Sequence, residues 1–208
     1  MTKNDIYQVI VTKYNQNQII DPFILSGITS TEKKIAELVK AKKIKKIAPK
    51  LYTSLSEDEL DSQIIKSWAF IVSSLYPKAL ISHSTAISYQ PNQENEIFLT
   101  SNRYRTIRIR KLKICFVKGP KALKSDIDFM GLKASSFERA LLENLSSTKN
   151  TNFKKNKSQD VIEQILEKRL ALKGENELNR IRIQAKKIGS SLKMEKEFAK
   201  INLIIGAL

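Results

Sequence analysis

The sequence predicts an α+β protein, and three observations along the chain lead to this class. A lysine-rich helical segment that begins with a capping motif is followed by a short β-hairpin. Apolar and polar residues then alternate in several short segments, which predicts a small α/β domain over residues 57–148. Past the polar linker 150–157, helical periodicity returns over residues 158–208. We therefore expect three parts, at residues 1–56, 57–148 and 158–208.

Two helices are expected before the lysine-rich segment. Residues 5–15 carry apolar side chains at helical spacing. Within the apolar stretch 19–25, Asp21 can cap a short helix that has Pro22 at its first position. Gly27 then marks a tight turn before the next helix.

A third helix and a hairpin complete the first part. Thr29 and Glu32 stand three residues apart, which is the spacing of a capping box at a helix start. The apolar face of this helix consists of Ile35, Leu38 and Val39. Two short strands, 44–47 and 51–53, follow it. Three helices with a glycine turn before the third, and then a hairpin, form the pattern of a winged helix-turn-helix.

The α/β part begins with a long helix over residues 57–76, which Pro77 stops. The strands expected after it are 79–81, 96–100, 106–110 and 112–116. A short helix is expected from Ser82 to Ile87. The apolar positions change from odd to even at Arg110-Lys111, which predicts a turn or a bulge between the last two strands.

Helices are expected for the rest of the chain. The first, at residues 135–145, is expected to place its charged side chains on a solvated face; these are Glu138, Arg139 and Glu143. The helices of the last part are expected at 158–173, 175–189 and 191–208. The apolar run at residues 203–208 leads us to expect that the chain is the front part of a longer protein.

The 208 residues carry a formal net charge of +16, which is unevenly distributed. Residues 1–56 hold ten basic and four acidic residues, whereas residues 57–100 hold two and six. Residues 101–124 hold nine basic residues and no acidic ones. Such a basic excess attracts nucleic acid or anionic membranes. The longest early apolar run, residues 68–72, is too short to span a membrane, and no signal peptide is recognisable, so we expect a soluble, cytoplasmic protein.

Residue types that carry catalysis or bind metals are sparse. One cysteine and one histidine rule out a disulfide framework and a zinc site of the Cys/His kind. We expect His83 to form a cap or a buried hydrogen bond, and Cys115 to be a core thiol or a small outward residue of a strand. We find no catalytic triad, paired carboxylates or phosphate-binding glycine loop, so we expect neither an enzyme nor a cofactor in these residues.

Two basic segments are candidates for contact with DNA. In a helix-turn-helix, the N-terminal part of the third helix enters the major groove, and wing lysines lie over the adjacent backbone. In the strand 106–110, Arg108 and Arg110 point to one face, opposite Ile107 and Ile109, and guanidinium groups pair well with phosphate. The candidate residues are Ser30, Thr31, Lys33, Lys34, Lys40, Lys45, Lys46, Lys50, Arg105, Arg108 and Arg110. The alternatives are a solvated helix and hairpin, a protein-docking module, and an edge strand protected by charge.

Four short motifs resemble the AbiEi-type antitoxin and transcriptional regulator family: "KLYTS", "ALISHSTAI", "EIFLTS" and "SFERALLENL". The resemblance covers residues 5–147. It implies a winged helix-turn-helix joined to an α/β antitoxin domain, binding to double-stranded DNA, repression of a toxin–antitoxin operon, and a cognate toxin as partner. The residues that match the family's DNA-facing helix and wing are Lys33, Lys34, Lys45, Lys46 and Lys50. Lys50-Leu51 stands where the family usually has a glycine before the wing tyrosine.

A second likeness covers more of the chain. "FVKGPKAL", "ALLENLSSTK", "GENELNRIR" and "MEKEFAKINLIIGAL" are similar to the N-terminal half of larger Fic-family proteins, where an AbiEi-like region precedes an AMP-transferring Fic domain. The Fic signature is not among these residues. This likeness implies a non-catalytic regulatory or target-recognition half whose partner is a C-terminal Fic domain. A third possibility is a basic domain that binds RNA or ribosomes without sequence preference.

Overall fold

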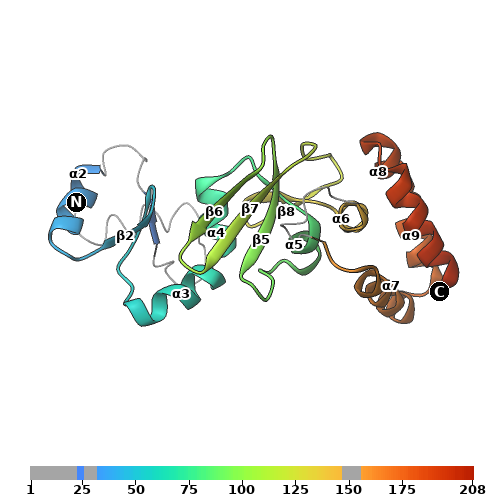
Figure 1. Ribbon diagram of the computed structural model, residues 1–208, viewed down its shortest axis with the longest axis horizontal. Helices are drawn as coiled ribbons and strands as arrows, with labels where there is room; N and C mark the ends of the chain where they lie inside the picture. The colour runs from blue at the N-terminus through green and yellow to red at the C-terminus, as the bar shows by residue number, and fades with distance from the viewer. Residues whose placement is uncertain (1–22, 26–31, 147–155) are drawn as a thin grey trace. The chain divides into compact units, whose positions relative to one another are not determined.

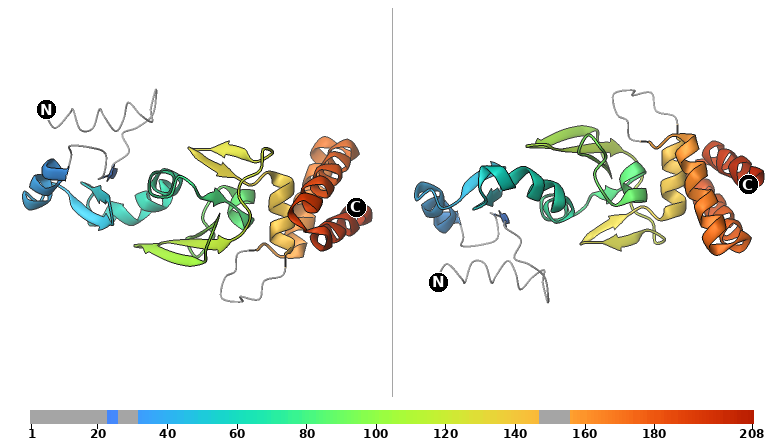
Figure 2. Two further views of the ribbon diagram at one scale, coloured as in Figure 1. Left: turned by 90° about the horizontal axis from the view of Figure 1, so that it is seen from above. Right: turned by 90° about the horizontal axis from the view of Figure 1, so that it is seen from below.

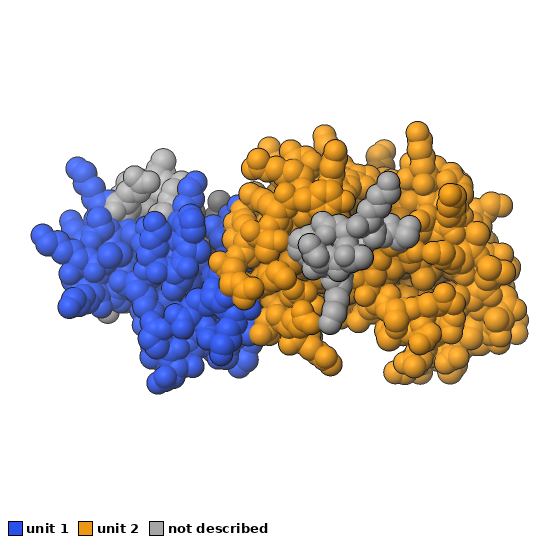
Figure 3. Space-filling model, in the orientation of Figure 1, with its two compact units in different colours: residues 1–75, 109–111 blue, residues 76–108, 112–208 orange. Residues whose placement is uncertain are grey.

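The computed structural model describes residues 23–25, 32–146 and 156–208. As the sequence predicts, the fold mixes helices and strands (Figure 1). The chain divides into two compact units, shown in Figure 3: unit 1 is residues 1–75 with 109–111, and unit 2 is residues 76–108 with 112–208. These boundaries do not coincide with the three parts expected from the sequence. None of the helices in the described ranges is long and apolar enough to cross a membrane.

Several sequence predictions fall outside the described residues. The first helix, at residues 5–15, is one of them, and so is the glycine turn at Gly27. The candidate DNA-contacting residues Ser30 and Thr31 also lie there.

Unit 1 contains a three-stranded sheet and the lysine-rich helix. The strands are β1 (Phe23–Leu25), β2 (Lys45–Ala48) and β3 (Leu51–Thr53), in the order β1-β3-β2, and the helix is α2 (Glu32–Lys40). β1 pairs antiparallel with β3, so that Ile24 lies opposite Tyr52. The prediction of a helix over 19–25 is therefore wrong for the three described residues. A Phe-Ile-Leu run suits a strand, and a partner strand distant in sequence decides the outcome.

The β2–β3 hairpin confirms the predicted pair of strands. Its two-residue turn is Pro49-Lys50, and the register shifts between Lys46 and Ala48, which indicates a β-bulge. A small apolar cluster joins the hairpin to α2; its members are Ile35, Ile44, Leu38 and Tyr52. Val39, expected on the apolar face of α2, is 38% exposed and does not belong to the cluster.

The long helix expected over residues 57–76 is two helices, α3 (Glu57–Lys66) and α4 (Trp68–Leu75). Ser67 separates them with φ −92° and ψ 18°, outside the helical region. α3 buries only Leu60 and Ile64, whereas the residues of α4 from Trp68 to Ser73 are all buried. The break at Ser67 therefore separates α3, which is buried along one stripe, from α4, which is buried on most of its sides.

Unit 2 is built on a six-stranded mixed sheet in the order β6-β7-β5-β4-β9-β8. The strands are β4 (Leu80–Ile81), β5 (Glu96–Ser101), β6 (Arg105–Ile109), β7 (Leu112–Lys118), β8 (Ile127–Phe129) and β9 (Leu132–Ala134). β5 runs parallel to β7, and β4 runs parallel to β9 and antiparallel to β5. The two outer hairpins, β6–β7 and β8–β9, form opposite edges of the sheet (Figure 2).

The two hairpins differ in how well the sequence predicts them. The predicted turn at Arg110-Lys111 is confirmed, and Arg110 has a positive φ of 53°. The β8–β9 hairpin was not predicted. Met130 and Gly131, which join its strands, have φ of 47° and 80°, the left-handed pair of a type I′ turn. Only Gly131 is a usual residue for that turn, so the sequence signal is weak.

The helices of unit 2 are α5 (His83–Ser88), α6 (Phe137–Leu145), α7 (Gln159–Lys173), α8 (Glu175–Leu192) and α9 (Glu195–Ala207). All were predicted, but α8 continues through Gly189 to Leu192 instead of ending at residue 189. α6 to α9 share one hydrophobic core, which includes Leu141, Leu142, Ile162, Leu166, Ile181 and Ile201. α6 therefore joins the sheet-bearing part of unit 2 to the C-terminal helices.

The charged face of α6 was expected in solvent, and this expectation is wrong. Arg139 is fully buried; its guanidinium lies 2.6 Å from the carboxylate of Asp126 and 2.8 Å from that of Glu143. It also donates to two backbone carbonyls at 3.0 Å, those of Lys121 and Pro120. Position 139 points inward, so Glu143 on the same helix and the partners from the loop at residues 120–126 replace water around the guanidinium.

Glu143 extends this buried network to α5. Its Oε2 accepts hydrogen bonds from the backbone N–H of His83 at 3.1 Å and from the hydroxyl of Ser135 at 2.9 Å. His83 is buried, and its Nδ1 lies 2.9 Å from the hydroxyl oxygen of Ser82, as expected for a structural histidine. Cys115 is buried in β7, and burial raises the pKa of its thiol to about 11.

Candidate nucleic-acid interface

Helix α2 presents lysines on the side opposite its apolar face. Ile35 is buried, and at 3.6 residues per turn Lys33 and Lys40 lie about 140–160° away from it around the helix. Both lysine side chains are exposed. Glu37 is exposed between them on the same stripe, so the stripe carries both signs of charge. Lys34 follows Lys33 in the first turn of α2.

Two further lysines cap the C-terminal end of α2. The N–H of Lys43 donates to the carbonyl of Leu38 at 2.9 Å, and that of Lys42 donates to the carbonyl of Val39 at 3.0 Å. Lys42 has φ 54°, so the end of α2 is a Schellman motif with lysine in the position that usually holds glycine. Both side chains are exposed, at the helix end where the dipole favours cations. We did not single out these two residues from the sequence, although they belong to the same basic run.

The hairpin places one lysine toward α2 and another away from it. Lys46 lies opposite Tyr52 in the β2–β3 register, and paired residues of antiparallel strands share a face. Tyr52 packs against the cluster that Ile35 of α2 forms with Ile44, so exposed Lys46 lies on the hairpin face that carries this contact with the helix. Lys45 lies opposite Thr53 on the other face and forms an ion pair with Glu57.

We call the resulting group of cations the basic helix–hairpin surface; it consists of Lys33, Lys40, Lys42, Lys43, Lys46 and Lys50. Lys50 is exposed at the tip of the turn. Within the part of the chain that the structure describes, none of the six forms an ion pair. Over residues 32–53, eight lysines stand against two glutamates, so this surface keeps a strong positive charge.

The arginines of β6 do not form one continuous row. The burial pattern of the strand alternates, so that Arg105 lies on the same side as Ile107 and Ile109. The guanidinium of Arg105 lies over the rings of Phe116 and Tyr76. Arg108 is exposed on the opposite side of the strand.

Arg110, at the hairpin tip that groups with unit 1, is held by two carboxylates. Its guanidinium lies 2.7 Å from Asp61 and 2.8 Å from Glu57, and Lys111 lies 3.2 Å from Asp61. The hydrogen bond from Arg110 lowers the pKa of Asp61 below its ordinary value. The pKa of Glu57 is lowered mainly by its hydrogen bond with Lys45, and also by Arg110. Of the candidate residues in or beside β6, Arg108 is thus the one whose head group meets neither a carboxylate nor an aromatic ring in the described structure.

Among the described residues, no group of three or more His, Cys, Asp or Glu side chains could hold a metal ion. No family model matches the chain, and no curated protein matches it either.

Proposed function

We propose that this protein is a double-stranded-DNA-binding transcriptional regulator of antitoxin type, and that α2 and the β2–β3 hairpin contact the duplex. The observation that carries the proposal is the arrangement of Lys46 and Tyr52. Because Lys46 pairs with Tyr52, the Lys46 side chain lies on the hairpin face that carries the contact with α2. The helix and the hairpin can therefore contact the same phosphate backbone.

The order of elements in unit 1 supports the proposal. A helix that precedes a two-stranded hairpin, with a third strand completing the sheet, is the arrangement that lets a helix enter the major groove while the hairpin lies over the adjacent backbone. Lysines on α2 would reach phosphates or guanine acceptors, and Lys46 and Lys50 would reach backbone phosphates. The antitoxin part of the proposal rests on the resemblance of residues 5–147 to AbiEi-type regulators.

The geometry also limits the proposed interface. Lys45 and Arg110 already bind carboxylates of α3, and Arg105 stacks on two rings, so we assign them no phosphate contact. Arg108, exposed on β6, is retained as a candidate.

The test is a gel-shift titration of the full chain on DNA from directly upstream of its own gene. Lys33→Ala/Lys40→Ala should weaken binding about tenfold or more, because two phosphate contacts of roughly 1 kcal/mol each are lost. The matched control is Lys186→Ala/Lys187→Ala, which removes the same charge from exposed positions of α8. Equal losses in the two double variants would mean that net charge, and not α2, governs binding.

Competition with a random duplex and with RNA tests the regulatory part. A specific regulator should remain bound to its upstream DNA in the presence of about a hundredfold excess of random duplex. Equal displacement by either competitor would leave only a non-specific polyanion binder.

A further inference from the structure

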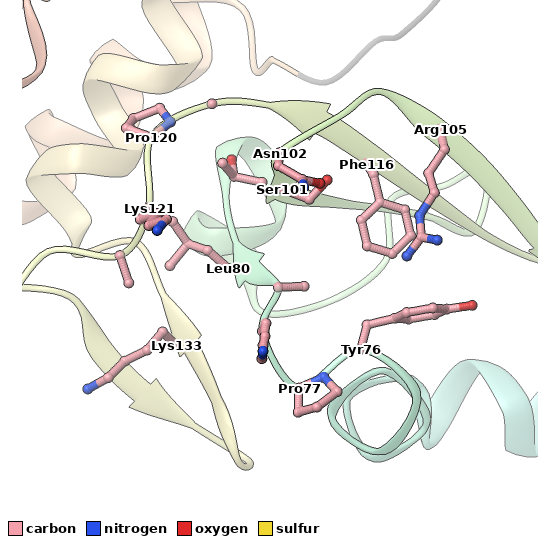
Figure 4. Close-up of a pocket in the computed structure, with 15 residues that line it drawn as sticks. Tyr76, Pro77, Leu80, Ser101, Asn102, Arg105, Phe116, Pro120, Lys121 and Lys133 are labelled. Carbon is pink, nitrogen blue, oxygen red and sulfur yellow. The ribbon is translucent and has the colours of Figure 1, made fainter.

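Unit 2 contains a pocket with a volume of about 800 Å³ (Figure 4). None of its lining residues belongs to the elements that carry the basic helix–hairpin surface. Its walls come from the connection that follows α4, from the end of β5, from the segment after β7 and from β9. The charged residues of its lining are all cations: Lys78, Arg105, Lys121 and Lys133. A concave site with this charge suits an anion.

Arg105 is held in place by aromatic rings rather than by carboxylates. Its guanidinium carbon lies 4.1 Å from the centre of the Phe116 ring and 4.8 Å from that of Tyr76. The two rings meet edge to face, with centres 5.1 Å apart, which fixes both around the guanidinium. In the described residues no hydrogen bond uses its N–H groups, so they remain available to a ligand.

The other lining groups gather where two parallel strands end. β5 and β7 are parallel neighbours, so the end of β5 with the residue after it, Thr100 to Asn102, and the segment after β7, Gly119 to Ala122, lie at the same end of the sheet. Ligands of α/β sheets commonly bind at the carboxyl ends of strands. The N–H of Gly119 donates to the carbonyl of Ser101 at 3.1 Å, which ties the two strand ends together.

Gly119 permits this close approach. A Cβ at this position would lie 2.9 Å from Cγ2 of Thr100, closer than carbon atoms pack. The lysines differ in how free they are, because Lys133 is 3.0 Å from the carboxylate of Asp128, whereas Lys121 forms no ion pair in the described structure. Lys78 also forms no ion pair in the described structure, so Arg105, Lys78 and Lys121 are the pocket cations without a carboxylate partner there.

We propose that this pocket binds a nucleoside monophosphate. Arg105, Lys121 and Lys78 would hold the phosphate, and the apolar lining, which includes Pro77, Leu80 and Pro120, would cover the nucleoside. A planar guanidinium fork matches phosphate bidentately, and the volume lies within the range of small-ligand pockets. The proposal does not depend on DNA binding by unit 1.

Isothermal titration calorimetry of the full chain with AMP tests the proposal, with adenosine and inorganic phosphate as comparison ligands. AMP should bind more tightly than either one, because only AMP occupies both the cationic and the apolar lining. Arg105→Ala and Lys121→Ala should each weaken AMP binding about tenfold or more. The matched control is Arg108→Ala, which removes the same charge from the opposite side of β6 and should change AMP affinity less than twofold.

Four results would overturn the proposal: no binding of AMP at millimolar concentration, adenosine or phosphate binding as tightly as AMP, unchanged affinity in Lys121→Ala, or an equal loss in Arg108→Ala. Circular dichroism checks that each variant folds. If Arg105→Ala is unfolded, the AMP affinity of Lys121→Ala alone tests the proposal, because Lys121 is exposed. Arg105→Ala should keep the DNA affinity of the native chain, and Lys33→Ala/Lys40→Ala should keep its AMP affinity. The two proposals can therefore fail separately.

Discussion

At the tip of the β2–β3 hairpin, Lys50 adopts a φ of 65°, a conformation that costs an L-residue with a side chain about 1 kcal/mol. Pro49 before it fixes its own φ near the value required at the first central position of a turn, and glycine is the usual residue at the second. This chain therefore has a charged residue at a position where the backbone favours glycine.

Replacing Lys50 with glycine tests this cost. Lys50→Gly should raise the free energy of unfolding by about 0.5–1 kcal/mol, since relief of the left-handed strain exceeds the added entropy of the unfolded chain. Urea denaturation measures the change. Lys46→Gly removes the same charge from a strand position without positive φ, and should instead lower stability by a similar amount. Equal effects of the two substitutions would contradict the prediction.

The environment of Arg139 differs most from the one predicted from the sequence. It lies on a helix with Glu138 and Glu143, a composition typical of a solvated face, yet it is fully buried with Asp126 and Glu143 as partners. Burial raises the pKa of Glu143 above its ordinary value, and the guanidinium of Arg139 counteracts this rise. In the described structure both carboxylates share the guanidinium of Arg139 as their cationic partner.

Removing the cation should therefore make stability depend on pH. At pH 7.5, Arg139→Gln should lower the free energy of unfolding by about 3–5 kcal/mol, because buried carboxylates lose their counter-charge. The pKa of Glu143 in the folded variant then lies further above that of the unfolded chain. The folded state takes up a proton that the unfolded state does not, so stability returns as the pH falls from 7.5 toward 5.

Urea denaturation at both pH values measures this effect. The control is Arg182→Ala on the exposed side of α8, which should change stability by less than about 0.5 kcal/mol. A loss of the same size at pH 5 and pH 7.5 would show that Glu143 does not titrate in the variant.

At the scale of elements, the helices α8 and α9 pack closely because α8 contains Gly189. A Cβ there would lie 3.3 Å from Cβ of Phe198 and 3.4 Å from the carbonyl oxygen of Met194. The helix expected from the sequence at residues 175–189 stops at this glycine. Instead, the helix continues to Leu192, and Lys193 ends it in a left-handed conformation.

A larger residue at this contact should separate the two helices. Gly189→Val should destabilise the protein by about 1–3 kcal/mol, since it overpacks the contact with α9. Gly206→Val in α9 is the control, because a Cβ at Gly206 meets no atom within 4 Å and the substitution should be nearly neutral. Thermal unfolding compares the two. A Gly189→Val variant as stable as the control would mean that the contact is not tight in solution.

At the scale of the whole molecule, the net charge of +16 is less informative than the way the fold distributes it. Six exposed lysines gather on the basic helix–hairpin surface, while Lys45 and Arg110 are neutralised by carboxylates of α3. Counting all basic residues would therefore overestimate the number of possible phosphate contacts.

The salt dependence of DNA binding measures how many of these cations act. If the six lysines each neutralise one phosphate, the slope of log affinity against log salt concentration should be about −5. Lys33→Ala/Lys40→Ala should reduce its magnitude by about 2, and Arg105→Ala should leave it unchanged. Fluorescence anisotropy at several salt concentrations gives the slope. A reduction of about 1 in Arg105→Ala, the amount expected for one lost phosphate contact, would mean that the pocket of unit 2 also contacts DNA.

Features that depend on neighbours along the chain are predictable from the sequence. The lysine-rich helix, the strands around Pro49-Lys50, the turn at Arg110-Lys111 and the C-terminal helices follow from local periodicity and turn chemistry. Which charges are exposed and which are paired depends instead on how the chain packs. Arg105, Arg110 and Arg139 are equivalent cations in the sequence, yet one stacks on rings, one binds α3 and one is buried. The reason is that a charge's environment is set by residues distant in sequence, which local patterns do not contain.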